Sequence, residues 1–413
     1  MKENKRNYPV ITITEKGEDF IESGNNWVYE NEIISYSKEH ENGDIVDVLS
    51  KKGKYLGTGF ISDVSKIRVR IFSKNANDVF DYDFFKRRVT YAIDYRLTVL
   101  DKIDACRIVF GEADGFPGLT VDKYNNILVT QVTTFGVERR KDLIFRALLE
   151  VFKEKGYTID AIYERNDVNS RALDGLELYK DYYYASSDFD INNKETIITE
   201  NGIKYYVDYV DGQKTGFFLD QRFNRELVGR IAKGKRVLDC FTHTGSFGLN
   251  CAINGAEKVV SVDISPLAVE QSRRNAELNN LQDKVTYVKA DVFDYLDKVK
   301  KREYDLIILD PPAFTKSRST VMAAFNGYKR INSKAMSLLG KGGYLVTCSC
   351  SHFMNEDLFV KMLLEAAKEN NMVLKQISYS QQGKDHPILL SSNQTDYLKF
   401  YILQWYTKLA CCF

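Results

Sequence analysis

The sequence predicts an α/β protein whose second half forms a doubly wound parallel sheet. Buried strands near residues 236–239, 258–263 and 285–291 each end in an acid and are followed by a segment at helical spacing. A fourth apolar strand at 304–309 runs into Asp310 and two prolines. Repeats of strand and helix are typical of parallel sheets with helices on both faces. Because ligands bind such sheets at the carboxyl ends of the strands, the acids there are candidate site residues.

The turn after the first of these strands has the features of a ligand-binding loop. Gly245 allows a tight turn, and residues 247–253 continue at helical spacing, so backbone N–H groups face an electron-rich ligand. Asp263 lies 24 residues after Asp239, close to the spacing at which an acid binds ribose hydroxyls. Neither G-x-G-x-x-G nor a P-loop lysine motif is present, which favours a ligand with adenosine but no phosphate.

Four segments resemble the class I S-adenosylmethionine (SAM) methyltransferases. Residues 239–245 resemble motif I, Asp263 the ribose-binding acid, 291–293 the adenine-edge segment and 310–314 motif IV. The resemblance implies a seven-stranded doubly wound sheet with SAM as its cofactor. The residues that it places at the cofactor are Asp239, Phe241, Thr244, Gly245, Asp263, Ile264, Asp291, Val292 and Asp310.

Residues 111–119, 214–222 and 349–351 are similar to signatures of the RlmI-like group of 23S ribosomal RNA methyltransferases. In that group an N-terminal PUA domain, an RNA-binding pseudo-barrel, precedes the other domains. The loop equivalent to 214–222 closes over SAM and substrate there, which adds Phe218, Asp220 and Gln221 to the expected cofactor contacts. The expected domains are a PUA-like β-barrel at 1–78, a middle α+β (EEHEE-like) domain at 79–212 and a methyltransferase domain at 213–413.

Composition limits the classes of protein that remain. A chain of 413 residues, 44% hydrophobic, is long enough for two or three domains, and its net charge of +1 requires any nucleic-acid site to be a local patch. Seven cysteines without paired C-x-x-C clusters argue for a reducing compartment and against zinc, so no metal is expected. There is no apolar signal core at 1–7 and no long apolar run, which predicts a cytoplasmic protein without a membrane partner. The oligomeric state is left open, with a homodimer among the options.

The first 75 residues contain short strands separated by glycine and asparagine, as in a small β-barrel. The alternation of residues 66–71 places Lys66, Arg68 and Arg70 on one face and apolar side chains on the core. The residues alone favour a solvated edge strand, whereas the resemblance favours RNA contact by these cations. Trp27 is expected in the core. The expected RNA contacts are Lys66, Arg68, Arg70, Lys214 and Phe314. The predicted strands are 10–13, 33–34, 44–49, 55–61 and 67–71.

The middle domain is predicted from a helix, a hairpin and further strands. The hairpin spans 119–132, with its turn at 125–126. The helices predicted here are 80–102 and 140–155, and the further strands are 159–164 and 203–210.

The resemblance implies methyl transfer to carbon 5 of a pyrimidine, most simply cytosine. That carbon is a poor nucleophile, so a cysteine thiolate adds first to carbon 6. Cys348 and Cys350 are the rivals, and Cys350 is favoured because it lies further toward the carboxyl end and aligns with the group's nucleophile. Asp310 is the expected acid near nitrogen 3 of the base.

Two alternatives remain open. Residues 310–314, Asp-Pro-Pro-Ala-Phe, also resemble the motif of base-nitrogen methyltransferases, which need no covalent catalysis; a purine nitrogen would then be the target and Cys350 a packing residue. A non-catalytic RNA-binding protein is the other alternative. A nucleotide-dependent oxidoreductase is disfavoured because the glycine-rich pyrophosphate turn is missing.

Overall fold

A computed structural model describes residues 6–315 and 317–407, and they form two compact units. The first unit contains the chain up to Thr196, together with Val207–Leu219 and Lys384–Thr395. The second contains Ile197–Tyr206, Asp220–Gly383 and the chain from Asp396. The domain boundaries at 78 and 212 stay a prediction. The N-terminal stretch 1–5 and the tail 409–413, for which the sequence suggests no function, lie outside the described residues.

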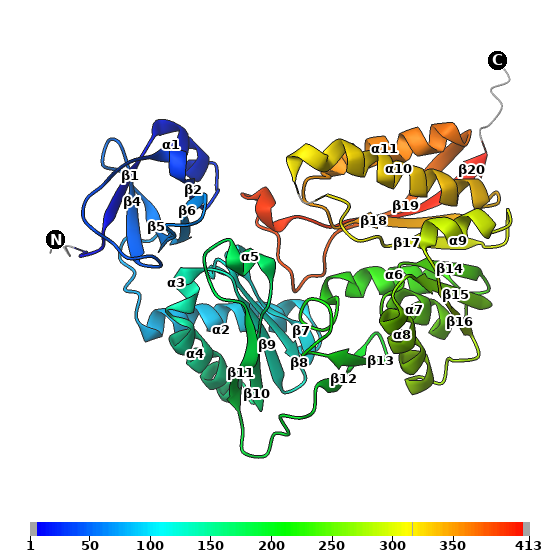
Figure 1. The fold of residues 1–413 in the computed structure, drawn as a ribbon, viewed down its shortest axis with the longest axis horizontal. Coiled ribbons are helices and arrows are strands. Elements are labelled where there is room, and N and C mark those ends of the chain that lie inside the picture. The colour runs from blue at the N-terminus through cyan, green and yellow to red at the C-terminus, as the bar shows by residue number, and fades with distance from the viewer. Residues whose placement is uncertain (1–5, 316, 408–413) are drawn as a thin grey trace. The chain divides into compact units, whose positions relative to one another are not determined.

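The first unit begins with a six-stranded sheet in the order β2-β6-β5-β4-β1-β3 (Figure 1). It confirms the strands predicted at 10–13, 55–61 and 67–71 within one or two residues, whereas the helix α1 and strand β2 were not predicted. Isoleucine and valine side chains of these strands form its core, among them Ile11, Val46 and Val69. Its elements are β1 (Val10–Ile13), α1 (Glu15–Glu22), β2 (Trp27–Tyr29), β3 (Ile33–Tyr36), β4 (Ile45–Ser50), β5 (Tyr55–Ile61) and β6 (Ile67–Ser73).

A five-stranded sheet in the order β11-β10-β9-β8-β7 follows in the same unit. The β8–β9 hairpin turns at Asn125, whose φ of 56° is the left-handed conformation that asparagine tolerates, so the predicted hairpin is confirmed. Helices α2 and α4 pack against each other beside this sheet (Figure 1). Its elements are α2 (Tyr82–Val99), β7 (Ala105–Phe110), β8 (Leu119–Tyr124), β9 (Ile127–Val132), α3 (Phe135–Glu138), α4 (Lys141–Glu154), β10 (Ala161–Asn166), α5 (Asn169–Ala172) and β11 (Tyr179–Ala185).

The segment Lys384–Thr395 belongs to the first unit although the chain before and after it belongs to the second. The Asp385 carbonyl accepts a hydrogen bond from the buried Arg96 guanidinium at 2.9 Å, and its carboxylate accepts one from the Arg107 N–H at 2.9 Å. Ser391 lies so close to Gly24 that a Cβ at that glycine would stand 2.3 Å from the serine Cβ. This late segment is therefore an integral part of the first unit.

The second unit is built on a seven-stranded sheet in the order β16-β15-β14-β17-β18-β20-β19, in which β20 is antiparallel to both of its neighbours. Helices α6, α7 and α8 cover one face, and α9, α10 and α11 cover the other (Figure 1). The doubly wound sheet predicted from the sequence is confirmed. Its strands are β14 (Arg236–Cys240), β15 (Lys258–Asp263), β16 (Val285–Lys289), β17 (Leu306–Leu309), β18 (Tyr344–Ser349), β19 (Met372–Ser380) and β20 (Lys399–Thr407). Its helices are α6 (Arg222–Ile231), α7 (Ser246–Ile253), α8 (Pro266–Leu278), α9 (Val292–Lys298), α10 (Val321–Leu338) and α11 (Glu356–Glu369).

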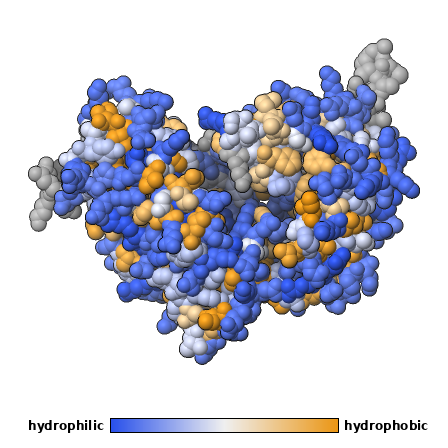
Figure 2. Space-filling model, viewed as in Figure 1, coloured by the Kyte–Doolittle hydropathy of each residue, from blue (hydrophilic) through white to orange (hydrophobic). Residues whose placement is uncertain are grey.

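The hairpin of β12 (Glu195–Glu200) and β13 (Ile203–Asp208) carries the chain across the boundary between the units. On the face of the molecule that Figure 2 shows, hydrophilic residues predominate and hydrophobic ones are scattered among them. Among the described residues, none of the helices is both long and apolar enough to cross a bilayer.

Candidate functional site

The turn between β14 and α7 is held in an unusual backbone conformation. Phe241, His243 and Gly245 have φ values of 61°, 50° and 79°, which residues other than glycine seldom adopt. The Thr242 N–H donates to the Val262 carbonyl at 3.1 Å, and the Gly245 N–H donates to Thr242. The turn leads into α7, and the N-terminus of a helix suits a carboxylate or another anionic group.

The Asp239 carboxylate holds this turn in place through hydrogen bonds. Its side chain is fully buried, and its Oδ2 accepts hydrogen bonds from the Thr242 hydroxyl, the Gly248 N–H at 3.0 Å and the Ser261 hydroxyl at 3.3 Å. Burial raises the pKa of Asp239 to about 7. The carboxyl group therefore supports the loop from inside the fold, and the contact with SAM expected of it stays a prediction.

The next two strands present the acids expected at the ribose and the adenine. Asp263 accepts from the His243 N–H at 3.0 Å and from the Ser265 N–H at 2.9 Å, so it links the turn to the end of β15. Ile264, beside it, is 63% exposed. Asp291 caps α9 by accepting from the Phe293 N–H at 2.8 Å.

Two further observations concern the fit of SAM to this edge of the sheet. The Tyr287 hydroxyl is buried and lacks a hydrogen-bond partner among the described residues, and it stands 3.2 Å from where a Cβ on Gly245 would lie. A bound ligand would satisfy such a group. Val292, in contrast, is 2% exposed and its side chain belongs to the core, so it can offer a cofactor its backbone and not its side chain.

At the end of β17, Asp310 is joined to Cys348 and Gln221. The Cys348 thiol donates to the Asp310 Oδ1 at 2.9 Å, and the Gln221 amide donates to the same oxygen at 3.4 Å. Burial, and then the neighbouring carboxylate, raises the pKa of the Cys348 thiol well above its ordinary value. Cys348 is therefore held as a neutral thiol, which is a poor nucleophile.

Cys350 differs from Cys348 in its position and its exposure. Strand β18 ends at Ser349, so Cys350 lies just beyond the strand and the side-chain alternation of a strand does not extend to it. Its side chain is half-buried, whereas that of Cys348 is fully buried. Of the two rival cysteines, Cys350 is the more accessible.

An aromatic pair stands beside this segment. The half-buried ring of Phe314 packs on Tyr328, with ring centroids 4.5 Å apart. The Tyr328 hydroxyl is bonded to the hydroxyl groups of Ser349 at 3.0 Å and Ser351 at 3.1 Å, and burial raises the pKa of Tyr328 to about 12. Ser349 and Ser351, which flank Cys350, are therefore both hydrogen-bonded to Tyr328, the residue on which Phe314 packs.

Sequence reasoning missed Lys399, which lies opposite Ser349 in the β18–β20 ladder. Its side chain is buried, and its ammonium donates to the carbonyl oxygens of Ser351 at 2.7 Å and Tyr397 at 2.8 Å. Burial lowers the pKa of Lys399 to about 8. The signal in the sequence was a single lysine in an otherwise apolar strand, residues 397–403.

The loop expected to close over the cofactor is divided between the units. Lys214 and Phe218 belong to the first unit, where the exposed lysine ammonium lies 4.2 Å from the centre of the Phe218 ring. Asp220 and Gln221 belong to the second, where the Asp220 carboxylate accepts from the Tyr397 hydroxyl at 2.6 Å.

The cationic stripe predicted on β6 is not an open surface. Lys66 is exposed, but Arg68 is buried and pairs with Glu30 at 2.7 Å. Arg70 lies 5.4 Å from the centre of the Trp27 ring. The prediction of three solvated cations on an edge strand is wrong, because Arg68 is buried and β6 lies inside the sheet between β2 and β5. RNA contact by these residues stays a prediction. The prediction of a core Trp27 is also wrong: it is half-buried on the edge strand β2.

A groove of about 660 Å³ in the first unit contains two cations, Lys74 and Arg88. Lys74 and Arg88 line it, and each donates to a backbone carbonyl, of Ile21 and Phe72 respectively. Neither has a carboxylate within 4 Å among the described residues, and burial lowers the pKa of Arg88. Two tyrosines of α2 also line the groove, Tyr91 at 60% exposure and Tyr95 at 36%.

The acids of this groove are already neutralised. Glu112 accepts from the Trp27 indole N–H at 3.1 Å and pairs with Arg70 at 3.7 Å, while Asp114 receives two hydrogen bonds from the Arg96 guanidinium. The groove therefore carries a local positive charge beside exposed aromatic rings.

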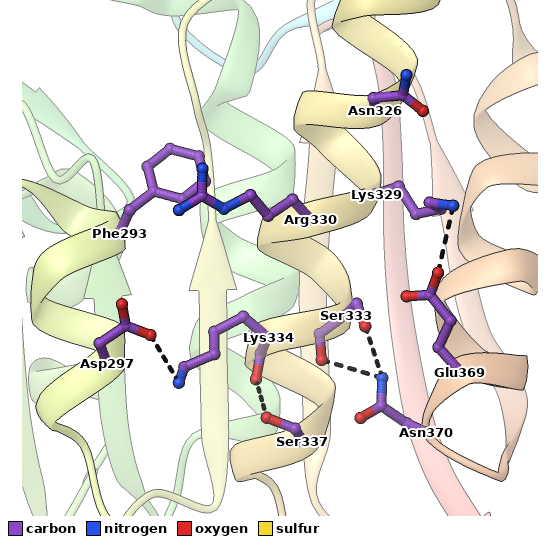
Figure 3. A pocket seen from close by; sticks show the side chains of 10 residues that line it. All are labelled: Phe293, Asp297, Asn326, Lys329, Arg330, Ser333, Lys334, Ser337, Glu369 and Asn370. Carbon is purple, nitrogen blue, oxygen red and sulfur yellow. Dashed lines mark hydrogen bonds and ion pairs between the residues drawn. The ribbon is translucent and has the colours of Figure 1, made fainter.

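A second hollow, of about 440 Å³, lies over α9, α10 and the end of α11 (Figure 3). Its charged side chains are largely paired with one another: Lys334 with Asp297 at 2.8 Å and Lys329 with Glu369 at 3.2 Å. None of the acids at the strand ends lines it. Within the described ranges, no His, Cys, Asp and Glu side chains gather into a group that could hold a metal ion.

Comparisons with known proteins agree with this geometry. Residues 183–386 match the family of S-adenosylmethionine-dependent methyltransferases, and residues 11–74 match the PUA-like domain family. The crystal structure of SMU.776 complexed with SAH has the same fold, with a TM-score of 0.80 at 23% identity over 96% of this chain and 99% of that one.

Full-length relatives are similar at higher identity. Ribosomal RNA large subunit methyltransferase I of Shewanella amazonensis is 39% identical over 378 residues, which cover 90% of this chain and 93% of the relative. The Klebsiella pneumoniae protein of the same name is 35% identical over 95% of this chain and 97% of its own. This similarity makes the chain an enzyme that uses SAM and sets aside the non-catalytic alternative. The chain belongs to the ribosomal RNA large subunit methyltransferase I family, with a PUA-like domain followed by a class I SAM-dependent methyltransferase fold.

Proposed function

We propose that the enzyme methylates carbon 5 of a cytosine in the RNA of the large ribosomal subunit, with Cys350 as the nucleophile. The observation that carries this proposal is the contrast between the two cysteines. Cys348 donates a hydrogen bond to Asp310 and is fully buried, whereas Cys350 is half-exposed beyond the end of β18. A covalent mechanism needs an accessible cysteine, and Cys350 is the more accessible of the two.

The proposed reaction consists of addition of the thiolate, transfer of the methyl group and elimination of the thiolate. The Cys350 thiolate forms a bond to carbon 6, which makes carbon 5 electron-rich; carbon 5 then takes a methyl group. When bound, SAM supplies that methyl group as an electrophile and leaves as S-adenosylhomocysteine. A base removes the proton of carbon 5, and the electron pair re-forms the ring double bond and expels the thiolate. Asp310, at the end of β17, acts in its protonated form as the acid near nitrogen 3, where negative charge develops.

The target base must leave its stack to reach these residues. Phe314 offers a half-exposed ring whose position Tyr328 fixes. Aromatic stacking on a flipped base is worth about 1–3 kcal/mol. The same ring supports the alternative reaction at a purine nitrogen, because Asp-Pro-Pro-Ala-Phe would hold the base by stacking and hydrogen bonds without a cysteine.

The test compares the wild-type protein with Cys350→Ala and Cys348→Ala. Each is incubated with unmodified large-subunit RNA and methyl-labelled SAM, and the digested nucleosides are identified by mass spectrometry. We expect labelled 5-methylcytidine from the wild type and from Cys348→Ala, and none from Cys350→Ala. A labelled purine made equally by all three would replace this proposal with the nitrogen alternative.

We also propose that RNA binds the groove of the first unit, in place of the β6 stripe. Lys74 and Arg88 would pair with phosphates, and Tyr91 and Tyr95 would stack on bases. Loss of a phosphate contact weakens binding to all sequences and reduces the salt dependence of affinity by roughly one unit of slope. A cytoplasmic location stays part of this prediction, since ribosomal RNA is found there.

Fluorescence anisotropy with a labelled fragment of large-subunit RNA tests the groove. Lys74→Ala and Arg88→Ala are each expected to weaken binding about tenfold at low salt. Lys86→Ala is the matched control, because Lys86 lies on the same helix but pairs with Glu150 at 2.6 Å and Glu154 at 2.7 Å. An equal loss in the control would show a general charge effect and remove the groove from the proposal.

A further inference from the structure

Lys399 is a buried cation that the proposed reaction does not yet use. Its side chain is 4% exposed, and no carboxylate lies within 4 Å of its ammonium among the residues described. Both of its hydrogen bonds go to backbone carbonyls, those of Ser351 and Tyr397. Carbonyl oxygens solvate a charge without neutralising it, so the positive charge of Lys399 acts on its surroundings.

The backbone geometry places that charge at the segment that contains Cys350. Strand β20 runs antiparallel to β18, and Lys399 stands directly opposite Ser349. Its ammonium reaches the carbonyl of Ser351, two residues further along. The three-residue segment that contains Cys350 is therefore held at one end by the strand ladder and at the other by the ammonium.

Four ionisable groups face Lys399, and two of them, Asp396 and Cys350, are left for its charge to act on. The four groups are the carboxylates of Asp396 and Glu356 and the thiols of Cys348 and Cys350. Glu356 accepts hydrogen bonds from the hydroxyls of Tyr379 at 2.9 Å and Tyr401 at 3.0 Å, so its charge is engaged elsewhere. The Cys348 thiol is kept protonated by burial and by the adjacent carboxylate of Asp310.

We infer that Lys399 is a positioning residue whose ammonium holds the Cys350 side chain in its thiolate form. A nearby cation favours the anionic form of a thiol, and a thiolate favours the ammonium in return, so each group stabilises the charge of the other. This inference rests on the proposed role of Cys350, but it concerns the ionisation of the thiol, which can be measured without RNA or SAM.

The experiment measures the rate at which iodoacetamide alkylates Cys350 as a function of pH, with tandem mass spectrometry to separate Cys350 from Cys348. For the wild type we expect a midpoint below about 8.5, the value of a free cysteine. Lys399→Met should raise the midpoint by about one pH unit, so the rate at pH 7 falls roughly tenfold. Above pH 10 the rates should converge, which a merely structural loss of access would not produce.

Two further variants make the result decisive. Lys399→Arg keeps the charge and is expected to restore the wild-type midpoint. Lys375→Met removes an exposed lysine of the neighbouring strand β19 and should leave the midpoint unchanged. An unchanged midpoint in Lys399→Met, or an equal shift in Lys375→Met, would overturn the inference.

If Lys399→Met unfolds the second unit, alkylation will extend to the buried Cys240 and Cys251. The alkylation midpoint of Cys350 in Lys399→Arg is then the deciding measurement. A midpoint equal to that of the wild type supports the inference, and a midpoint one pH unit higher overturns it. Failure of the proposed function is separate, because it would appear as methylation that persists in Cys350→Ala whatever the alkylation profile.

Discussion

Replacing Asp239 by asparagine should change how the stability of the second unit depends on pH. Burial raises the pKa of this carboxyl from 3.8 to about 7 in the folded protein. A group whose pKa is higher in the folded than in the unfolded state stabilises the fold fully below the unfolded value, and that contribution is lost as pH rises toward the folded value. One unit of pKa difference is worth about 1.4 kcal/mol, so ionising Asp239 costs the folded state roughly 4 kcal/mol in total.

Asparagine keeps an oxygen that can accept from the Gly248 N–H but does not ionise. Relative to Asp239→Asn, the free energy of unfolding of the wild type should therefore fall by about 2 kcal/mol between pH 5 and pH 7 and change little above pH 8. Urea unfolding of the intact apo protein at several pH values, followed by tryptophan fluorescence and circular dichroism, measures this difference.

A matched variant is Asp305→Asn. A hydrogen bond from Arg236 lowers the pKa of Asp305, so this carboxylate is ionised in both states across the same pH range. Its variant should differ from wild type by the same amount at pH 5 and pH 7. If Asp239→Asn also ran parallel to the wild type, the carboxyl would be ionised in the fold and the reasoning about its burial would be refuted.

Three other substitutions have definite expected outcomes. Gly245→Ala places a Cβ 3.1–3.2 Å from its neighbours at a φ of 79°, so calorimetry should show SAM binding weakened about tenfold; Gly255→Ala, at a φ of 88° but with no atom nearer than 3.6 Å, should bind SAM normally. Arg225→Met removes the guanidinium that donates two hydrogen bonds to the buried Glu200 carboxylate, and it should lower the free energy of unfolding by about 3 kcal/mol. A change below about 1 kcal/mol would contradict the view that these two side chains form a buried ion pair. Tyr328→Phe loses two hydroxyl contacts but keeps its ring, so thermal unfolding should show a loss of about 1–2 kcal/mol, and no loss would mean that those contacts contribute nothing.

The doubly wound sheet of the second unit could be predicted because its signals are local. Each acid at a strand end follows a short apolar run, and the parallel sheet brings those ends together. The β8–β9 hairpin could also be predicted, since an asparagine pair between two strands of alternating polar and apolar residues favours a tight turn.

The features that escaped prediction depend on contacts between residues distant in sequence. Arg68 looked like a solvated cation because Glu30, its partner, lies 38 residues earlier. Lys399 looked like part of an ordinary strand, since its hydrogen bond to Ser351 spans 48 residues. The alternation of residues along a strand predicts which face of the sheet a side chain lies on. It does not predict whether an ion-pair or hydrogen-bond partner from a distant part of the chain lies on that face.

The placement of Lys384–Thr395 in the first unit bears on how the chain folds during synthesis. The buried Arg96 guanidinium and the Arg107 N–H both donate hydrogen bonds to Asp385, which the ribosome adds almost 280 residues after Arg107. The first unit therefore cannot complete its contacts until nearly the whole chain has emerged. Until then the contacts of Asp385 with Arg96 and Arg107 are missing, although Arg96 can already pair with Asp114. A truncation between the units would remove the Asp385 contacts permanently, so the first unit is expected to be less stable as an isolated fragment.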